Sequence, residues 1–184
     1  MTFFKLNKHI YILVFFLIFF LTGIFIVSQY GISIDEDKTR IVGFVSLEYI
    51  FKIFLPEQAA KINEIIAQKT HATYGMMTTS VGVVTSGITF NLPMAVLELI
   101  LEINDSREIF LLRHFFNFLL FFISVYFFFQ LVKSRYNSWL VGLIGALFLI
   151  ISPRIFADSF YNNKDIVFMS LFIISLFTAT KFLE

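Results

Sequence analysis

One apolar run decides which solvent this chain folds in. Residues 10–27 read IYILVFFLIFFLTGIFIV, eighteen residues without a charge. At about 1.5 Å per residue, a helix of this length covers about 27 Å, which is close to the thickness of bilayer hydrocarbon. The run therefore predicts a membrane-spanning helix.

A cleaved signal peptide is the alternative interpretation of this N-terminus. Lys5 and Lys8 supply a positive flank, but the run is longer than the usual apolar region of about 7–15 residues. Only SQYG follows it, which is not a small-residue cleavage site. We expect an uncleaved first span.

The composition extends this conclusion to the whole chain. Hydrophobic residues make up 58% of its 184 residues and charged residues only 15%, against about 25% charged residues in an average globular domain. We expect an all-α fold, a polytopic membrane helix bundle that forms a single membrane domain over residues 1–184. The expected spans are about 10–27, 109–132, 137–152 and 165–181.

The long loop between the first two spans, residues 29–108, contains helical patterns of its own. Pro56 suits the first turn of a polar helix, and Glu98 and Glu102 are expected on the wet face of an amphipathic one. Such helices can lie in the membrane interface with their apolar sides down, so we expect interfacial helices in this loop. The expected helices are 39–54, 56–69 and 91–103, with a Gly/Thr/Ser-rich break at 73–87.

The charges predict an orientation for these spans. With four spans, all of the thirteen acids except the terminal Glu184 fall on one side of the membrane, and the segments on the other side are basic. The positive-inside rule then places both termini in the cytoplasm and residues 29–108 and 152–165 outside. The basic residues of the cytoplasmic side are Lys5, Lys8, Lys133, Arg135 and Lys181.

Polar residues that can carry chemistry gather near the outer ends of the spans. Carboxylates there can deprotonate a hydroxyl or hold a divalent metal, and arginine binds phosphate as a bidentate fork. The chain has no cysteine and three scattered histidines, so we predict neither a thiolate nor a histidine metal site. The three groups are Asp35, Glu36 and Asp37; Arg113, His114 and Asn117; and Arg154, Asp158, Lys164 and Asp165.

Each group also has a purely structural interpretation. Three acids after a span are typical of a solvated loop, and Arg113 can simply extend to the lipid headgroups. Asp165 can serve as the N-terminal cap of the fourth span. Asp105, with Glu108 three residues later, has the spacing of a capping box for the second span.

Several of these stretches occur together in one known family. The acidic pair after the first span, the long outer loop, LLRHFFNFLLFF at 111–122 and SPRIFADSFYNNKDIVFMSLF at 152–172 resemble the GT-C membrane glycosyltransferases. The resemblance is to their dolichyl-phosphate-mannose protein mannosyltransferase-like group of bacterial enzymes, which use polyprenyl-phosphate sugars. The SPR-F…N-KD stretch is its most specific part.

The resemblance implies roles for particular residues. Asp35 matches the catalytic acid of the first outer loop, and Glu36 is its partner. Asp165 matches the acid of the second outer loop, which in this group lies near the same cavity. The residues expected to bind the donor phosphate are Arg113, Arg154 and Lys164.

The function implied is transfer of a sugar from a polyprenyl-phosphate donor to an acceptor hydroxyl at the outer face of a bacterial inner membrane, with inversion. Some GT-C enzymes use a divalent cation and others do not, so the resemblance leaves the cofactor open. Members usually have nine or more spans, so this chain resembles a truncated N-terminal portion that a downstream chain would complete. The expected setting is protein glycosylation in the cell envelope.

A non-catalytic small membrane protein that binds lipid or a partner subunit is the alternative function. A transporter is disfavoured, because no expected span carries an ionisable residue at mid-membrane. The net charge of +1 and the lack of a basic run give no indication of a nucleic-acid partner.

Overall fold

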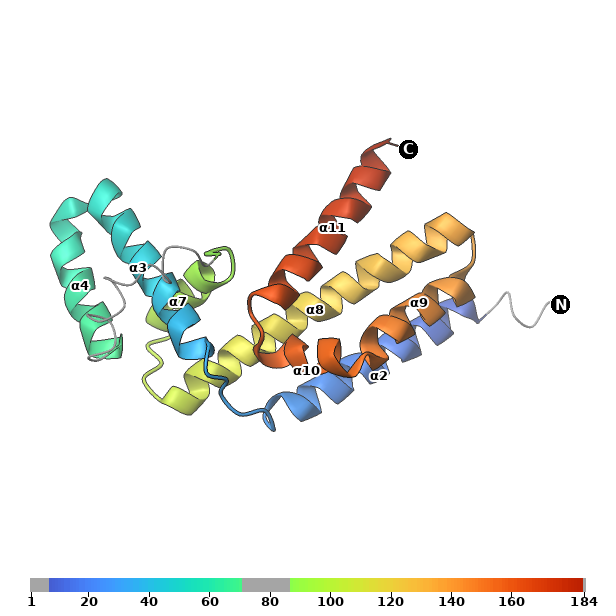
Figure 1. The fold of residues 1–184 in the computed structure, drawn as a ribbon, viewed down its shortest axis with the longest axis horizontal. Helices are drawn as coiled ribbons and strands as arrows, with labels where there is room; N and C mark the ends of the chain where they lie inside the picture. Colours follow the sequence, from blue (N-terminus) through green and yellow to red (C-terminus); the bar gives the residue numbers. More distant parts are fainter. Residues whose placement is uncertain (1–6, 71–86, 184) are drawn as a thin grey trace. The chain divides into compact units, whose positions relative to one another are not determined.

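A computed structural model describes residues 7–70 and 87–183, and these residues form helices without any strand, as predicted. The chain divides into two compact units, coloured along the sequence in Figure 1. The inserted unit is Gly31–Arg113, and the span unit is Met1–Tyr30 with His114–Glu184. The helices are α2 (Lys8–Val27), α3 (Glu36–Phe54), α4 (Pro56–Thr70), α7 (Asn91–Ile100), α8 (Ser106–Tyr136), α9 (Trp139–Ile151), α10 (Pro153–Tyr161) and α11 (Asp165–Leu183).

Three of these helices, α2, α8 and α11, are long and apolar enough to cross a membrane. They contain the predicted spans 10–27, 109–132 and 165–181. The third predicted span, 137–152, differs, because α9 has 13 residues and continues into α10 through a bend of 69°. The two together form either one broken span or a re-entrant segment. Residues 152–165, expected to join two spans, are therefore largely helical.

Phenylalanine builds the core of the span unit. Phe16 and Phe19 of α2 pack with Phe118 of α8, and Phe160 of α10 stacks on Phe118 with ring centroids 5.3 Å apart and planes 7° apart. Such aromatic pairs contribute about 0.5–1.5 kcal/mol beyond the area they bury. Gly23 of α2 lies directly over the Phe118 ring, where a side chain would not fit. These contacts hold α2, α8 and α10 together.

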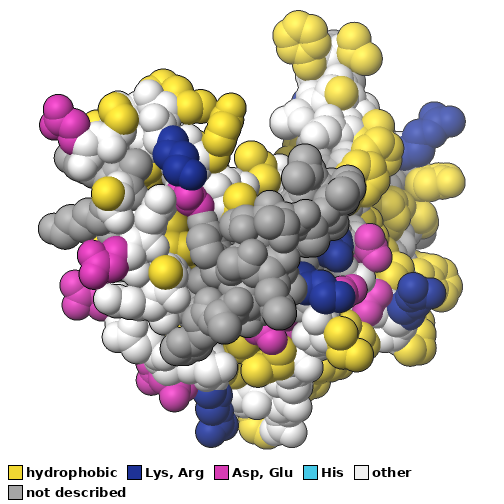
Figure 2. Space-filling model, turned by 60° about the vertical axis from the view of Figure 1, so that its left-hand side comes forward, with side chains coloured by type: hydrophobic (Ala, Val, Ile, Leu, Met, Phe, Trp, Pro, Cys, Tyr) yellow, Lys and Arg dark blue, Asp and Glu magenta, His cyan; other side chains and the backbone are white. Residues whose placement is uncertain are grey.

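Large apolar side chains also cover the outside of the candidate spans. Leu13 and Phe25 on α2 and Phe168 on α11 are 66%, 74% and 74% exposed. Figure 2 shows hydrophobic side chains projecting from the surface among charged side chains of both signs. In water such a surface would drive association, whereas in lipid it faces hydrocarbon at no cost.

The inserted unit is built around α3, which packs against α4 and α7. Phe44 of α3, Ile66 of α4 and Ala95 of α7 form its buried core. Gly43 lets α3 approach α7 closely, because a Cβ at this position would collide with the backbone carbonyl of Asn91. The predicted helices 39–54 and 56–69 are therefore confirmed, with α3 beginning three residues earlier.

The segment from α7 to α8 departs from its sequence pattern in one respect. The helix expected over 91–103 ends at Ile100, and Glu102 takes a left-handed backbone conformation with φ 53°. Asp105 then caps α8 as predicted, since its Oδ1 accepts from the backbone N–H of Glu108 at 3.1 Å. Apart from Gly87, the Gly/Thr/Ser-rich stretch at 73–87 lies outside the described residues.

Candidate functional site

Two adjacent acids at the start of α3 lie in opposite environments. The Asp35 side chain is 65% exposed, with Lys38 Nζ 3.8 Å from its Oδ1. Glu36 is 2% exposed, and its Oε2 accepts from the backbone N–H of Ser33 at 2.6 Å. This contact has the Ser-x-x-Glu spacing of a capping box, but it closes the turn before α3, whose N-cap is Asp35. Glu36 thus anchors the turn that leads into α3, and Asp35 is left accessible to a reactant.

A buried ion pair links α3 to α7. Arg40 Nε donates to Glu98 Oε2 at 3.0 Å, and Arg40 Nη2 donates to Glu98 Oε1 at 2.5 Å. Glu98 is 1% exposed, so its expected place on the wet face of an interfacial helix is wrong. The face of α7 that carries Glu98 turns toward α3, where the planar fork of Arg40 matches both carboxylate oxygens.

Arg113, in the part of α8 that belongs to the inserted unit, is the second buried arginine. It is 2% exposed, and its Nη2 donates to Asn91 Oδ1 at 3.0 Å. Its Nε and Nη1 are buried without a hydrogen-bond acceptor among the described residues. The structural alternative, in which this side chain extends to the headgroups, is therefore wrong. Two buried donors of Arg113 thus lack an acceptor among the described residues.

These residues form one group, which we call the ionic cluster: Glu36, Arg40, Asn91, Glu98 and Arg113. The charges of Glu98, Arg40 and Glu36 all act on Arg113, and the two acids and two arginines balance. Burial of charge is tolerated when it is paired and hydrogen-bonded in this way. The cluster joins the beginning of α3 to α7 and to the first turns of α8, and so holds Asp35 on a fixed frame.

The other predicted site residues lie in the span unit, Arg154 near the start of α10 and Lys164 and Asp165 at the corner between α10 and α11. Asn162 Oδ1 accepts from the backbone N–H groups of Lys164 at 3.3 Å and Asp165 at 3.0 Å. Asn162, rather than Asp165, therefore caps α11. Asp165 is the first residue of that helix, and its exposed Oδ2 accepts from Asn162 Nδ2 at 3.0 Å. Arg154 is 89% exposed, and its Nε lies 3.7 Å from Asp158 Oδ2.

Asn117 has a structural role in the same unit. It is 1% exposed, and its Nδ2 donates to the backbone carbonyls of Ser159 at 3.0 Å and Asp158 at 3.4 Å. The amide thereby ties α8 to the last turn of α10, which positions the corner that carries Lys164 and Asp165.

The structure brings together only part of the predicted site. Glu36 and Arg113 share the ionic cluster, and Asp35 directly precedes Glu36 in the chain. Arg154, Lys164 and Asp165 belong to the other unit. The approach of Asp35 to Asp165 stays a prediction. Sequence reasoning missed Arg40 and Asn91, although Arg40 follows Glu36 by four residues, a spacing that places both on one helix face.

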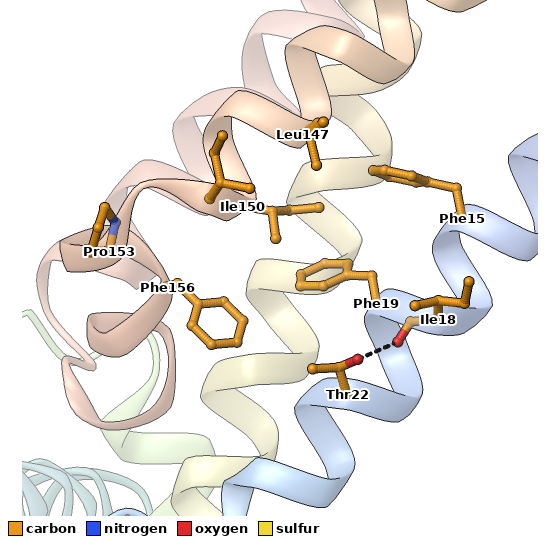
Figure 3. Close-up of a pocket in the computed structure, with 9 residues that line it drawn as sticks. Phe15, Ile18, Phe19, Thr22, Leu147, Ile150, Pro153 and Phe156 are labelled. Carbon is orange, nitrogen blue, oxygen red and sulfur yellow. Dashed lines mark hydrogen bonds between the residues drawn. The ribbon is translucent and has the colours of Figure 1, made fainter.

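The span unit also contains an apolar groove of about 580 Å³ between α2, α9 and α10. In Figure 3, Phe15 and Phe19 of α2 face Leu147 and Ile150 of α9 across it. The hydroxyl of Thr22, its most polar lining group, is satisfied by the Ile18 carbonyl at 2.8 Å. The groove therefore suits a hydrocarbon chain. The residues that line it are Phe15, Ile18, Phe19, Thr22, Leu147, Ile150, Ile151, Pro153 and Phe156.

No protein family, curated protein or solved structure matches this chain. Among residues 7–70 and 87–183, no three His, Asp or Glu side chains lie close enough together to hold a metal ion.

Proposed function

We propose that this chain takes part in transfer of a sugar from a polyprenyl-phosphate donor to an acceptor hydroxyl at the outer face of the membrane. The observation that carries the proposal is the contrast at the start of α3. Asp35 is exposed there, eight residues after α2 ends at Val27, while its neighbour Glu36 is buried in the ionic cluster. An accessible acid on a rigid support, a few residues along the chain from a candidate span, suits attack on a lipid-linked sugar.

Asp35 acts as the general base in this proposal. The acceptor oxygen attacks the anomeric carbon, and its proton passes to the Asp35 carboxylate as the new bond forms. The bond from that carbon to the phosphate oxygen breaks, and the polyprenyl phosphate leaves with the electron pair. Base catalysis of this kind contributes about 10²–10⁴-fold.

The cations of the chain are assigned to the donor phosphate. Arg113 supports this role because its Nε and Nη1 have no acceptor among the described residues. Exposed Arg154 and Lys164 are the further candidates. Positive charge at the leaving phosphate stabilises the transition state as negative charge develops there.

The apolar groove is assigned to the prenyl chain of the donor. Its walls are almost wholly hydrocarbon, and Phe15, Phe19 and Thr22 of α2 lie along it. Burial of hydrocarbon is favourable by about 0.8 kcal/mol per CH₂ relative to water. Relative to lipid the gain is smaller, so the groove serves mainly to orient the donor.

The membrane arrangement belongs to the same proposal. The candidate spans lie in a bacterial inner membrane with both termini in the cytoplasm. The helices α3, α4 and α7 lie at the outer interface, with the apolar side chains that stay exposed on them, such as Phe54 and Ile100, toward the lipid.

The test uses the full chain in nanodiscs, a short-chain polyprenyl-phosphate mannose as the donor probe and a serine-containing peptide as the acceptor. Asp35→Asn should lower transfer by about two orders of magnitude or more, because asparagine cannot take the proton. Binding of the probe should change little.

Asp37→Asn is the matched control, since Asp37 is exposed on the same turn and has no assigned role. It should leave transfer within about twofold, as expected for a solvated surface position. Wild-type protein without transfer, or equal mild effects of the two substitutions, would contradict the proposal. Probe binding that survives without transfer would instead favour the non-catalytic lipid-binding function, which the apolar groove also supports.

A further inference from the structure

A second cavity, of about 660 Å³, lies at the end of the span unit where four helices start or finish. Lys8 begins α2 and Trp139 begins α9, while Lys133 lies in the last turn of α8 and Lys181 in the last turn of α11. All four residues line the cavity. Its volume is within the range of about 300–1,000 Å³ that is typical of small-ligand sites.

The electrostatics of this cavity favour an anion. Lys8, Lys133 and Lys181 line it, and none of its described lining residues is acidic. The N-terminal ends of α2 and α9 and the C-terminal ends of α8 and α11 meet here, so their helix dipoles offset one another and the lysines supply the net positive charge. Lys133 Nζ is held near the cavity by Gln130 Oε1 at 3.4 Å and by the Phe129 ring, whose centroid is 5.8 Å away. The positive charge is therefore partly pre-organised.

The rest of the lining favours a lipid over a free anion. Ile12, Phe129 and Phe177 form an apolar part of the wall, on the sides of three candidate spans. Trp139 also lines the cavity and stacks on Tyr11, with ring centroids 6.1 Å apart and planes 11° apart. Trp and Tyr gather at the depth of the lipid headgroups. A ligand here needs a charged head and an apolar tail.

From these features we propose that the cavity binds the phosphate of an anionic phospholipid, with the glycerol and first methylenes against the apolar wall. The lysines act as point charges on the phosphate. Basic pockets between the cytoplasmic ends of transmembrane helices bind anionic headgroups by this chemistry. The site is independent of the proposed sugar transfer, since it shares no residue with the ionic cluster, the apolar groove or the α10–α11 corner.

The single tryptophan of the chain, Trp139, reports on the site directly. The full chain is reconstituted in phosphatidylcholine vesicles that contain brominated phosphatidylglycerol, or brominated phosphatidylcholine at the same fraction. Bromine quenches tryptophan fluorescence at short range, so the anionic lipid should quench Trp139 more strongly. Lys133→Gln and Lys181→Gln should each lower that preference about fivefold, as expected for loss of one lysine at a membrane surface.

Two matched variants separate the site from its alternatives. Arg135→Gln removes a neighbouring exposed cation that does not line the cavity, and it should leave the preference unchanged. Lys133→Arg keeps the charge and should retain the preference. A loss in Arg135→Gln as large as in Lys133→Gln would overturn the proposal in favour of general surface charge.

The source of the phosphate is tested in the same vesicles. Inorganic phosphate should not abolish the difference between the two brominated lipids, because it lacks the apolar part of the ligand. If inorganic phosphate abolishes the difference in quenching between the two brominated lipids, the site binds a free anion and the proposal is overturned. Equal quenching by the two brominated lipids would overturn it as well.

Discussion

Arg40 and Glu98 form a two-point ion pair, at 3.0 and 2.5 Å, across 58 residues of sequence. The Arg40 side chain is 11% exposed and that of Glu98 is 2% exposed. The pair joins α3 to α7 and lies in the same cluster as Glu36, whose carboxylate anchors the turn beside Asp35. The geometry at the candidate base thus depends on a contact between distant parts of the chain.

Arg40→Met should destabilise the inserted unit by about 3–5 kcal/mol, because it leaves Glu98 buried without its counter-charge. Faster hydrogen exchange in α3 and α7 would report this loss. Arg40→Met/Glu98→Leu should recover most of it, since two apolar side chains of similar volume replace the pair.

Lys52→Met is the control for this comparison. Lys52 pairs with Glu48 one turn away on α3, but its side chain is 57% exposed. The Glu48 side chain is 11% exposed, but water reaches the Lys52 end of the pair, so its loss should cost less than loss of the Arg40–Glu98 pair. Equal exchange in Lys52→Met and Arg40→Met would show that the buried pair has no special part in stability.

Gly43→Ala should loosen the contact of α3 with α7. The new Cβ would collide with the backbone carbonyl of Asn91, which cannot rotate away as a side chain can. Overpacking of this kind costs about 1–3 kcal/mol, which exceeds the gain of up to about 1 kcal/mol in helix propensity from Gly to Ala. Thermal unfolding should show a lower midpoint. Gly31→Ala, where nothing lies within 4 Å, should leave the midpoint unchanged or slightly raised.

Gly23→Ala should disturb the span unit, because the new Cβ would meet the ring of Phe118. Phe118→Leu alone should also destabilise. In the double variant the two losses should not add, with a favourable coupling of about 0.5–3 kcal/mol between contacting sites. Gly145→Ala, whose nearest neighbour would be a Val132 methyl at 3.3 Å, should be milder. Strict additivity at positions 23 and 118 would contradict this packing.

The orientation of the chain is tested by cysteine labelling, for which the absence of native cysteine is convenient. Ser106→Cys and Ser134→Cys both place a thiol at an exposed position, near opposite ends of α8. An impermeant maleimide added outside intact cells should label position 106 and spare position 134 until the membrane is opened. The reverse pattern would contradict a cytoplasmic location for the termini.

Local sequence patterns determined the helices of this protein. Apolar runs as long as bilayer hydrocarbon predicted α2 and α8, and a shorter run predicted α11. Pro56 and Asp105 marked helix starts that the structure confirms. These signals are local, because a proline ring or a carboxylate at a helix start acts within one turn. The Ser152–Pro153 step likewise disfavours a continuous helix, and the chain bends by 69° between α9 and α10.

Only the tertiary structure decided which polar groups are buried. Glu98 has the spacing of a solvated residue, yet it is buried because Arg40, on another helix, supplies its counter-charge. Asp35 and Glu36 are adjacent and chemically alike, and only the fold separates an exposed acid from a buried anchor. Burial of a charge depends on partners that no local pattern specifies, since the desolvation penalty is offset only where the fold brings opposite charges together.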